Sequence, residues 1–182
     1  MNYVIPSWNL PSLPVEGSEE RFPVRRIYCI GRNYTAHARE MGADEREPPF
    51  FFLKPGDAIV ENNATIPYPP ATENLHYEAE LVVALGKCGS NVSVENANDH
   101  VFGYGVGIDL TRRDLQEEAK GMRRAWDMGK GFDSSAPCSK IYPASSIGHP
   151  ENGSITLTVN GELRQSGDIG DMIWDVPESI AY

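Results

Sequence analysis

Two pairs of residues in this chain have types and spacings that could support acid–base or metal chemistry. His37 and Glu40 are three positions apart, so they share one face if residues 35–41 form a helix. Glu78 and Glu80 are two positions apart, so on a strand both carboxylates point the same way. Two parallel carboxylates repel each other unless a cation lies between them, and hard oxygen ligands suit Mg²⁺ or Mn²⁺. A base beside a divalent cation indicates an enzyme.

Asp109 and Lys130 extend this set further along the chain. Asp109 ends an apolar, glycine-spaced run, and Lys130 lies between Gly129 and Gly131, so its side chain can reach into a site unobstructed. Three carboxylates in apolar surroundings are costly to bury in the ionised form without a cation. Plainer interpretations stay open. Glu78 and Glu80 could form the solvent-facing side of an edge strand, His37 and Glu40 could be a surface pair, and Lys130 could lie on a solvated loop.

The composition is that of an ordinary globular protein. The chain has 182 residues, of which 40% are hydrophobic and 23% charged, and this is long enough for one domain with a sizeable core. The net charge of −10 argues against a nucleic-acid or anionic-membrane partner. Three widely spaced cysteines without a CxxC pair fit a reducing compartment. Because neither a signal peptide nor an apolar run of membrane-spanning length is present, we expect a cytoplasmic protein.

The elements that must position these residues are short. Prolines and glycines predict an extended arm over residues 1–24, which leaves residues 25–182 as the catalytic domain. Apolar stretches predict strands over 26–30, 50–53, 75–87 and 101–110. Helices are predicted over 94–100, capped by Ser93, and over 111–121, opened by a capping box of Thr111 and Asp114. Asn160 and Gly161 predict the type I′ turn of a hairpin over 154–165.

The end of the sequence has the pattern of a helix start. Asp175 can cap a helix that has Pro177 and Glu178 in its first turn. The chain stops at Tyr182, barely one turn later, and a helix this short is marginal by itself. We therefore expect a fold that is truncated at the C-terminus.

With these segments in order, the chain resembles the fumarylacetoacetate hydrolase family from about residue 25 to its last residue. The stretches that carry the resemblance are Gly31-Arg32-Asn33-Tyr34 leading to His37 and Glu40, His76-Tyr77-Glu78-Ala79-Glu80-Leu81, residues 107–116, residues 126–133, the hairpin around Asn160-Gly161, and Asp171-Met172-Ile173-Trp174. Residues 22–29 and 47–52 are most similar to the fumarylpyruvate hydrolase, or acylpyruvase, branch, which acts in gentisate-type aromatic degradation. The family's later Pro-Gly-Asp turn and Gly-Thr-Pro loop are missing from this sequence.

The resemblance implies a fold, a metal site and partners. The fold is α+β and mostly β, a rolled mixed β-sandwich with short helices. The implied ligands of Mg²⁺, or of Mn²⁺, are Glu78, Glu80 and Asp109. A homodimer and a small anionic diketo-acid substrate are expected, with no nucleic acid and no membrane.

Catalytic and substrate-binding roles follow from the same resemblance. His37, oriented by Glu40, would draw a proton from water, and Lys130 would stabilise developing negative charge. Candidates for contacts with the substrate are Arg113 and Gln116, and less strongly Tyr34 and Lys54.

The implied reaction is hydrolytic carbon–carbon cleavage of an acylpyruvate, most of all fumarylpyruvate to fumarate and pyruvate. The same metal and enolate chemistry also supports an oxaloacetate-type decarboxylase or tautomerase on this fold. Hydrolysis needs the dyad of His37 and Glu40, whereas decarboxylation does not, and this favours the hydrolase. A truncated relative without catalytic activity is the third alternative.

Overall fold

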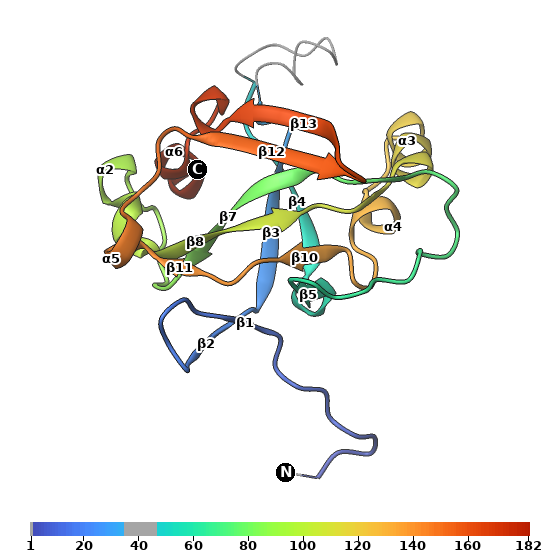
Figure 1. Cartoon of the computed structure of the whole chain (residues 1–182), viewed down its shortest axis with the longest axis horizontal. Helices are drawn as coiled ribbons and strands as arrows, with labels where there is room; N and C mark the ends of the chain where they lie inside the picture. The colour runs from blue at the N-terminus through green and yellow to red at the C-terminus, as the bar shows by residue number, and fades with distance from the viewer. Residues whose placement is uncertain (1, 35–46) are drawn as a thin grey trace.

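A computed structural model describes residues 2–34 and 47–182 (Figure 1). Short strands and short helices make up this part of the chain, which confirms the expected mostly β member of the α+β class. The strands are β1 (Ser12–Pro14), β2 (Arg21–Pro23), β3 (Arg26–Gly31), β4 (Phe50–Pro55), β5 (Ile59–Glu61), β6 (Leu75–His76), β7 (Ala79–Leu85), β8 (Val101–Ile108), β9 (Thr111–Arg112), β10 (Ala136–Cys138), β11 (Tyr142–Pro143), β12 (Ser154–Val159) and β13 (Glu162–Asp168). The helices are α2 (Val94–Ala97), α3 (Arg113–Gly121), α4 (Asp127–Lys130), α5 (Ala144–Ile147) and α6 (Val176–Ala181), with 3₁₀ turns η1 (Gly56–Ala58), η2 (Asn98–His100) and η3 (Ile169–Asp171).

The largest sheet is built around β8. This strand pairs antiparallel with β7 along most of its length and with β10 and β11, and β10 pairs in parallel with β5. Glycine recurs in β8 because neighbouring backbone comes very close there: a Cβ atom at Gly103 would lie 2.3 Å from the carbonyl oxygen of Tyr142. The pairs β1–β2, β3–β4, β6–β9 and β12–β13 form separate two-stranded sheets around it.

Residues near the N-terminus contribute to the core. Leu13 in β1 and Val24 after β2 pack with Ala84 and Cys138 of the central sheet and with Ile141, which precedes β11. Residues 2–10 are extended and exposed, and in Figure 1 they run away from the body of the molecule. The division of the chain at residue 24 into arm and domain stays a prediction.

Two expected elements differ from the observed ones. The predicted strand over 75–87 is divided into β6, which pairs with β9, and β7, which pairs with β8. The predicted capping box at the start of α3 is wrong. Thr111 is buried in β9 and its hydroxyl donates to the Asp109 carbonyl, while the carboxylate of Asp114 accepts hydrogen bonds from Thr72 and the Glu73 backbone.

Elements with strong local signals match the sequence closely. The hairpin β12–β13 turns at Asn160 and Gly161, whose φ angles of 53° and 83° are those of a type I′ turn. Helix α6 begins with the expected cap, Asp175, and Glu178 returns a hydrogen bond to complete a capping box. The expected helix over 94–100 consists of α2 followed by η2, with Ser93 at the cap position but no capping hydrogen bond from its side chain. The helices in the described ranges include none that is long and apolar enough to cross a membrane.

Candidate active site

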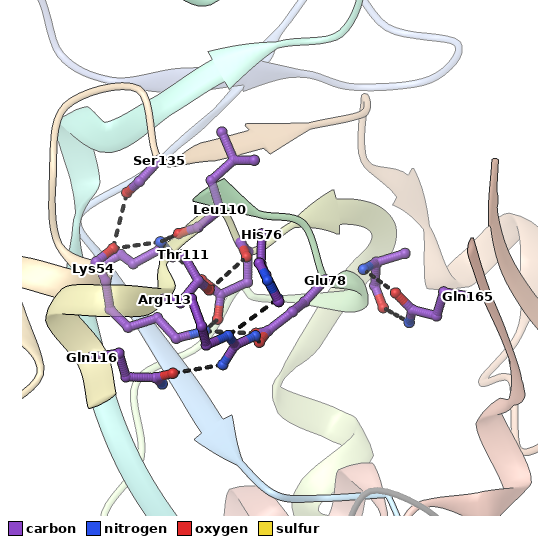
Figure 2. Close-up of polar contacts among 12 residues, drawn as sticks. Lys54, His76, Glu78, Leu110, Thr111, Arg113, Gln116, Ser135 and Gln165 are labelled. Carbon is purple, nitrogen blue, oxygen red and sulfur yellow. Dashed lines mark hydrogen bonds and ion pairs between the residues drawn. The ribbon is translucent and has the colours of Figure 1, made fainter. Parts of the chain in front are cut away.

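The central residues of the candidate site are brought together by the pairing of β7 with β8. Ala79 lies opposite Ile108 in this antiparallel ladder, so Glu78, which precedes β7, is adjacent to Asp109, which follows β8. Lys130, the last residue of α4, inserts its ammonium between them. Its Nζ donates to Asp109 Oδ2 at 2.7 Å and to Oε2 of Glu78, which is labelled in Figure 2, at 2.6 Å. Lys130 is only 2% exposed. Three residues from the predicted set therefore meet in a buried ion-pair network.

A second ammonium approaches Asp109 from the opposite side. Lys54, in β4, is also 2% exposed and forms an ion pair with Asp109 Oδ1 at 2.9 Å. Its Nζ also donates to the carbonyl oxygens of Leu110, at 3.0 Å, and of Lys130. These bonds join β4, α4 and the turn after β8. The structure therefore places Lys54 inside the site, and its predicted contact with substrate stays a prediction.

Arg113 and Gln116, the predicted substrate contacts on α3, lie side by side at the edge of this network. Arg113 Nη1 donates to Gln116 Oε1 at 2.6 Å, and its Nη2 donates to Glu78 Oε1 at 2.5 Å. Its Nε donates to His76 Nδ1 at 3.3 Å. Glu78 is thus held by a guanidinium on one oxygen and an ammonium on the other. This pairing also explains why a carboxylate is tolerated here, because each of its oxygens accepts a charge-assisted hydrogen bond.

The pKa values of the carboxylates reflect this uneven charge distribution. Burial raises the pKa of Glu78, but Lys130 and Arg113 outweigh burial and bring that pKa down to about 2. Burial, followed by the charges of Glu78 and Asp109, raises the pKa of Glu80 to about 8. Burial also raises the pKa of Asp109 against the opposing effect of the two lysines. The surroundings of Glu80 are therefore negatively charged, and a bound cation would compensate the charges of these carboxylates.

The donor set fits a hard divalent cation, although the side chains are not gathered around one point. Glu78, Glu80 and Asp109 offer only carboxylate oxygens, the ligands that Mg²⁺ and Mn²⁺ prefer. Within residues 2–34 and 47–182, no three His, Cys, Asp or Glu side chains are arranged to hold a metal ion as they stand, and Lys130 Nζ lies between two of the three carboxylates. The assignment of these ligands stays a prediction.

The remaining predicted residues belong to the segment that follows β3. Tyr34 forms an isolated bridge with Met172, and its hydroxyl is buried without a hydrogen-bond partner among the described residues. Burial, with a contribution from the Glu80 carboxylate, raises the pKa of Tyr34 to about 12, which keeps the phenol protonated and able to donate. His37 and Glu40 lie outside the described residues, so their role as a dyad stays a prediction.

Sequence reasoning missed several residues that complete the site. Cys29 in β3 lies opposite Phe52 in β4, and the Phe52 ring centroid is 5.1 Å from Lys130 Nζ. Burial, and next the charge of Asp109, raise the pKa of the Cys29 thiol to about 12. Gln165 in β13 binds the backbone of Ala79 through its side-chain amide. Cys29 and Phe52 lie in two apolar runs that the sequence predicts as strands, whereas Gln165 is 86 positions from its partner and has no local signal.

Comparison with known proteins identifies relatives of this chain. The family profile described as "Fumarylacetoacetate (FAA) hydrolase C-terminal" matches residues 26–182. A fumarylpyruvate hydrolase from Ralstonia sp is 45% identical over 135 residues, which are 74% of this chain and 70% of that protein. Oxaloacetate tautomerase YcgM from Escherichia coli strain K12 is 37% identical over 168 residues, covering 92% of this chain and 77% of that protein.

The fold comparison gives the same result. The crystal structure of fumarylpyruvate hydrolase from Pseudomonas aeruginosa in complex with Mn²⁺ and pyruvate is 53% identical in sequence. Its superposition has a TM-score of 0.94 and covers 100% of this chain and 80% of that chain. Sequence, fold and family profile thus agree, and the chain belongs to the fumarylacetoacetate hydrolase family of enzymes, in its fumarylpyruvate hydrolase branch.

Proposed function

We propose that this chain is a metal-dependent hydrolase that cleaves a carbon–carbon bond in a β-diketo acid of the acylpyruvate type, with fumarylpyruvate as the foremost substrate. The proposal rests on the buried ammonium of Lys130, which donates hydrogen bonds to the carboxylates of both Glu78 and Asp109. Support comes from the Pseudomonas aeruginosa relative, which is described in complex with Mn²⁺ and pyruvate. We place the activity in the degradation of aromatic compounds, following the resemblance to the fumarylpyruvate hydrolase branch, and in the cytoplasm, following the three widely spaced cysteines.

Glu78, Glu80 and Asp109 would hold Mg²⁺ or Mn²⁺ in this proposal. The bound ion would supply Lewis acidity to the α-keto acid end of the substrate. Lys130 contributes a second positive charge that is already desolvated, since only 2% of the residue is exposed. A buried, fixed ammonium stabilises negative charge on a nearby substrate oxygen more strongly than one in water does.

The proposed cleavage begins with water activation by the dyad. His37, oriented by Glu40, takes a proton from water, and the resulting hydroxide attacks the ketone carbon distal to the carboxylate end. The carbon–carbon bond then breaks, and its electron pair remains on the pyruvate fragment as an enolate. That enolate takes a proton to give pyruvate, and the other fragment leaves as fumarate. Lys130 stabilises the oxyanion of the addition step and then the enolate.

The substrate contacts in this proposal come from the rim of the site. Arg113 and Gln116 present a joined guanidinium and amide that can bind a substrate carboxylate. The Tyr34 phenol can donate to a substrate oxygen, because its hydroxyl is unpartnered among the described residues and stays protonated. Lys54 acts mainly through Asp109, its ion-pair partner.

An absorbance assay tests the proposed reaction. Fumarylpyruvate is incubated with the protein and Mg²⁺ or Mn²⁺, with and without a chelator, and loss of the diketone band is followed together with pyruvate release. We expect metal-dependent loss of the band with one pyruvate formed per substrate. His37→Ala should abolish turnover and still bind Mn²⁺. Absence of metal-dependent cleavage in the parent protein would refute the hydrolase assignment.

Oxaloacetate tautomerisation is a second candidate, favoured by the match to the Escherichia coli tautomerase over 92% of this chain. The same assay separates the two chemistries when oxaloacetate is the substrate. A faster decay of the enol band without pyruvate release indicates a tautomerase, and decay with pyruvate release indicates a decarboxylase. Turnover of neither fumarylpyruvate nor oxaloacetate would support the non-catalytic relative.

A homodimer is part of the proposal because the family resemblance implies one. Exposed apolar residues such as Tyr28 and Leu53 on the β3–β4 ribbon offer a surface that a second chain could cover. Light scattering after size-exclusion chromatography should give a mass of two chains, and a mass of one chain would remove this part of the proposal.

A further inference from the structure

The β12–β13 hairpin is attached to the central sheet at the beginning of β7. In the described part of the chain, β7 forms ladder hydrogen bonds with β8 and with no other strand. At the first residue of β7, Ala79, the backbone N–H and C=O both point away from β8 and toward the hairpin, where they meet the side chain of Gln165. The hairpin thus reaches β7 through a side chain instead of through a strand ladder.

The contact between Gln165 and Ala79 has two hydrogen bonds. The N–H of Ala79 donates to Gln165 Oε1 at 2.8 Å, and Gln165 Nε2 donates to the Ala79 carbonyl at 2.7 Å (Figure 2). A side-chain amide carries a donor and an acceptor side by side, so it can pair with one residue's backbone as a neighbouring strand would. Ala79 is 3% exposed, so without Gln165 its N–H and C=O would be left buried and unpaired, which is costly.

The residue held in this way lies between two of the predicted metal ligands. Glu78 precedes Ala79 and Glu80 follows it, so the backbone at Ala79 sets where both carboxylates begin. The other side of the segment is held by Asp109, whose backbone N–H donates to the Glu78 carbonyl at 2.8 Å. The Glu78–Glu80 segment is therefore fixed from both sides, by the third predicted ligand and by Gln165.

We propose that Gln165 is a positioning residue: its amide fixes the backbone at Ala79 so that Glu78 and Glu80 are placed to hold the metal ion. This role rests on the proposed function. Gln165 hydrogen-bonds to the Ala79 backbone and to neither carboxylate, so it acts through the backbone between them. Loss of a group that hydrogen-bonds to a metal ligand typically weakens metal binding by roughly 10- to 100-fold, and we expect the same range for Gln165.

The competing explanation is that Gln165 only attaches the hairpin to the protein. The two explanations differ in what a matched destabilising change does. Ile155 lies in β12 of the same hairpin, is 8% exposed and pairs with Gly167, so it is on the same face as Gln165 and two residue pairs away from it. Ile155→Ala loosens the hairpin by removing buried methyl groups and leaves the Gln165 amide in place. If attachment alone matters, both changes should affect the metal site equally.

The test measures Mn²⁺ binding to the full chain by titration calorimetry, with the electron paramagnetic resonance spectrum of the bound ion as a second readout. Gln165→Met keeps the length of the side chain and removes both hydrogen bonds, and we expect Mn²⁺ to bind roughly 10- to 100-fold more weakly with an altered spectrum. Ile155→Ala should bind Mn²⁺ within twofold of the parent. Gln165→Glu keeps the acceptor for the Ala79 N–H and loses the donor, so its affinity should lie between the two.

Three results would overturn the proposal. The first is parent-like Mn²⁺ affinity in a folded Gln165→Met variant, and the second is equal weakening of Mn²⁺ binding in Gln165→Met and Ile155→Ala. The third is parent-like Mn²⁺ affinity in Gln165→Glu. This third result decides the question if Gln165→Met does not fold. A parent protein that binds no Mn²⁺ refutes the proposed function itself. Parent-like binding in the Gln165 variants refutes only the positioning role.

Discussion

Replacing Lys130 by methionine removes one positive charge from the centre of the site and keeps a side chain of similar length. The ammonium of Lys130 donates to Glu78 Oε2 at 2.6 Å and to Asp109 Oδ2 at 2.7 Å, and the residue is 2% exposed. After Lys130→Met, Asp109 keeps the ion pair with Lys54 and Glu78 keeps Arg113, but each loses one of its two cations. The negative charges of Glu78 and Asp109 are then only partly compensated.

The expected loss of stability follows from the burial of these groups. Removing one partner of a buried ion pair typically costs about 3–5 kcal/mol, because the other charge stays buried and uncompensated. The side chain of Glu78 is 25% exposed, so water screens part of its charge and the lower part of that range applies. We expect the free energy of unfolding of the metal-free protein to fall by about 3 kcal/mol, which lowers Tm by roughly 6–12 °C for a chain of this size.

Thermal unfolding in the presence of a chelator, and then with Mn²⁺, measures this effect. A divalent cation replaces the lost positive charge, so Mn²⁺ should raise Tm more in Lys130→Met than in the parent protein. Lys140→Met is the matched control, because Lys140 pairs with Glu16 at the surface, where the same substitution should leave Tm almost unchanged. A Lys130→Met variant that unfolds within 2 °C of the parent in chelator, or gains no more than the parent from Mn²⁺, would contradict the reasoning.

Two further predictions concern other parts of the fold. Among the cysteines, Cys88 is exposed, whereas burial raises the pKa of Cys29 to about 12 and that of Cys138 to about 11. A thiol reagent at pH 8 should therefore label Cys88 quickly, and Cys29 and Cys138 only after unfolding. Rapid labelling of more than one thiol in the native protein would count against this burial. Gly103→Ala places a Cβ 2.3 Å from the carbonyl oxygen of Tyr142, so β11 must move and the free energy of unfolding should fall by about 1–3 kcal/mol; an unchanged midpoint in urea would show that β11 is not packed this closely.

Elements governed by neighbouring residues could be predicted from the sequence. The turn at Asn160 and Gly161 needs two positive φ angles, and these residue types adopt them readily, so the hairpin followed directly. Helix α6 likewise begins where Asp175 and Glu178 cap each other. The capping box predicted for α3 failed because tertiary partners compete for the same groups. Thr111 is drawn into β9, and Asp114 accepts hydrogen bonds from Thr72 and Glu73, about forty positions earlier.

The candidate site shows the same division between local and distant information. The family-like order of residues brought Glu78, Asp109 and Lys130 into one prediction, and the structure joins these three. The contact of Lys54 with Asp109 and the contact of Gln165 with Ala79 each connect residues more than fifty positions apart. Neither contact leaves a periodic or spacing pattern in the sequence, because only the packing of β4 and of the hairpin against the central sheet brings those partners together.

The glycines beside Lys130 show how a correct prediction can have an incomplete physical reason. In the sequence, Gly129 and Gly131 indicated a lysine with an unobstructed path into a site. In the structure, a Cβ atom at Gly129 would lie 3.0 Å from both the Cβ and the backbone nitrogen of Gln116, so the glycine lets α4 approach α3 more closely than another residue would allow. That approach puts the end of α4 beside the turn after β8, where Lys130 meets Asp109. Gly129 therefore positions the lysine through helix packing, and a Cβ there would require α4 and Gln116 to move apart by a few tenths of an ångström.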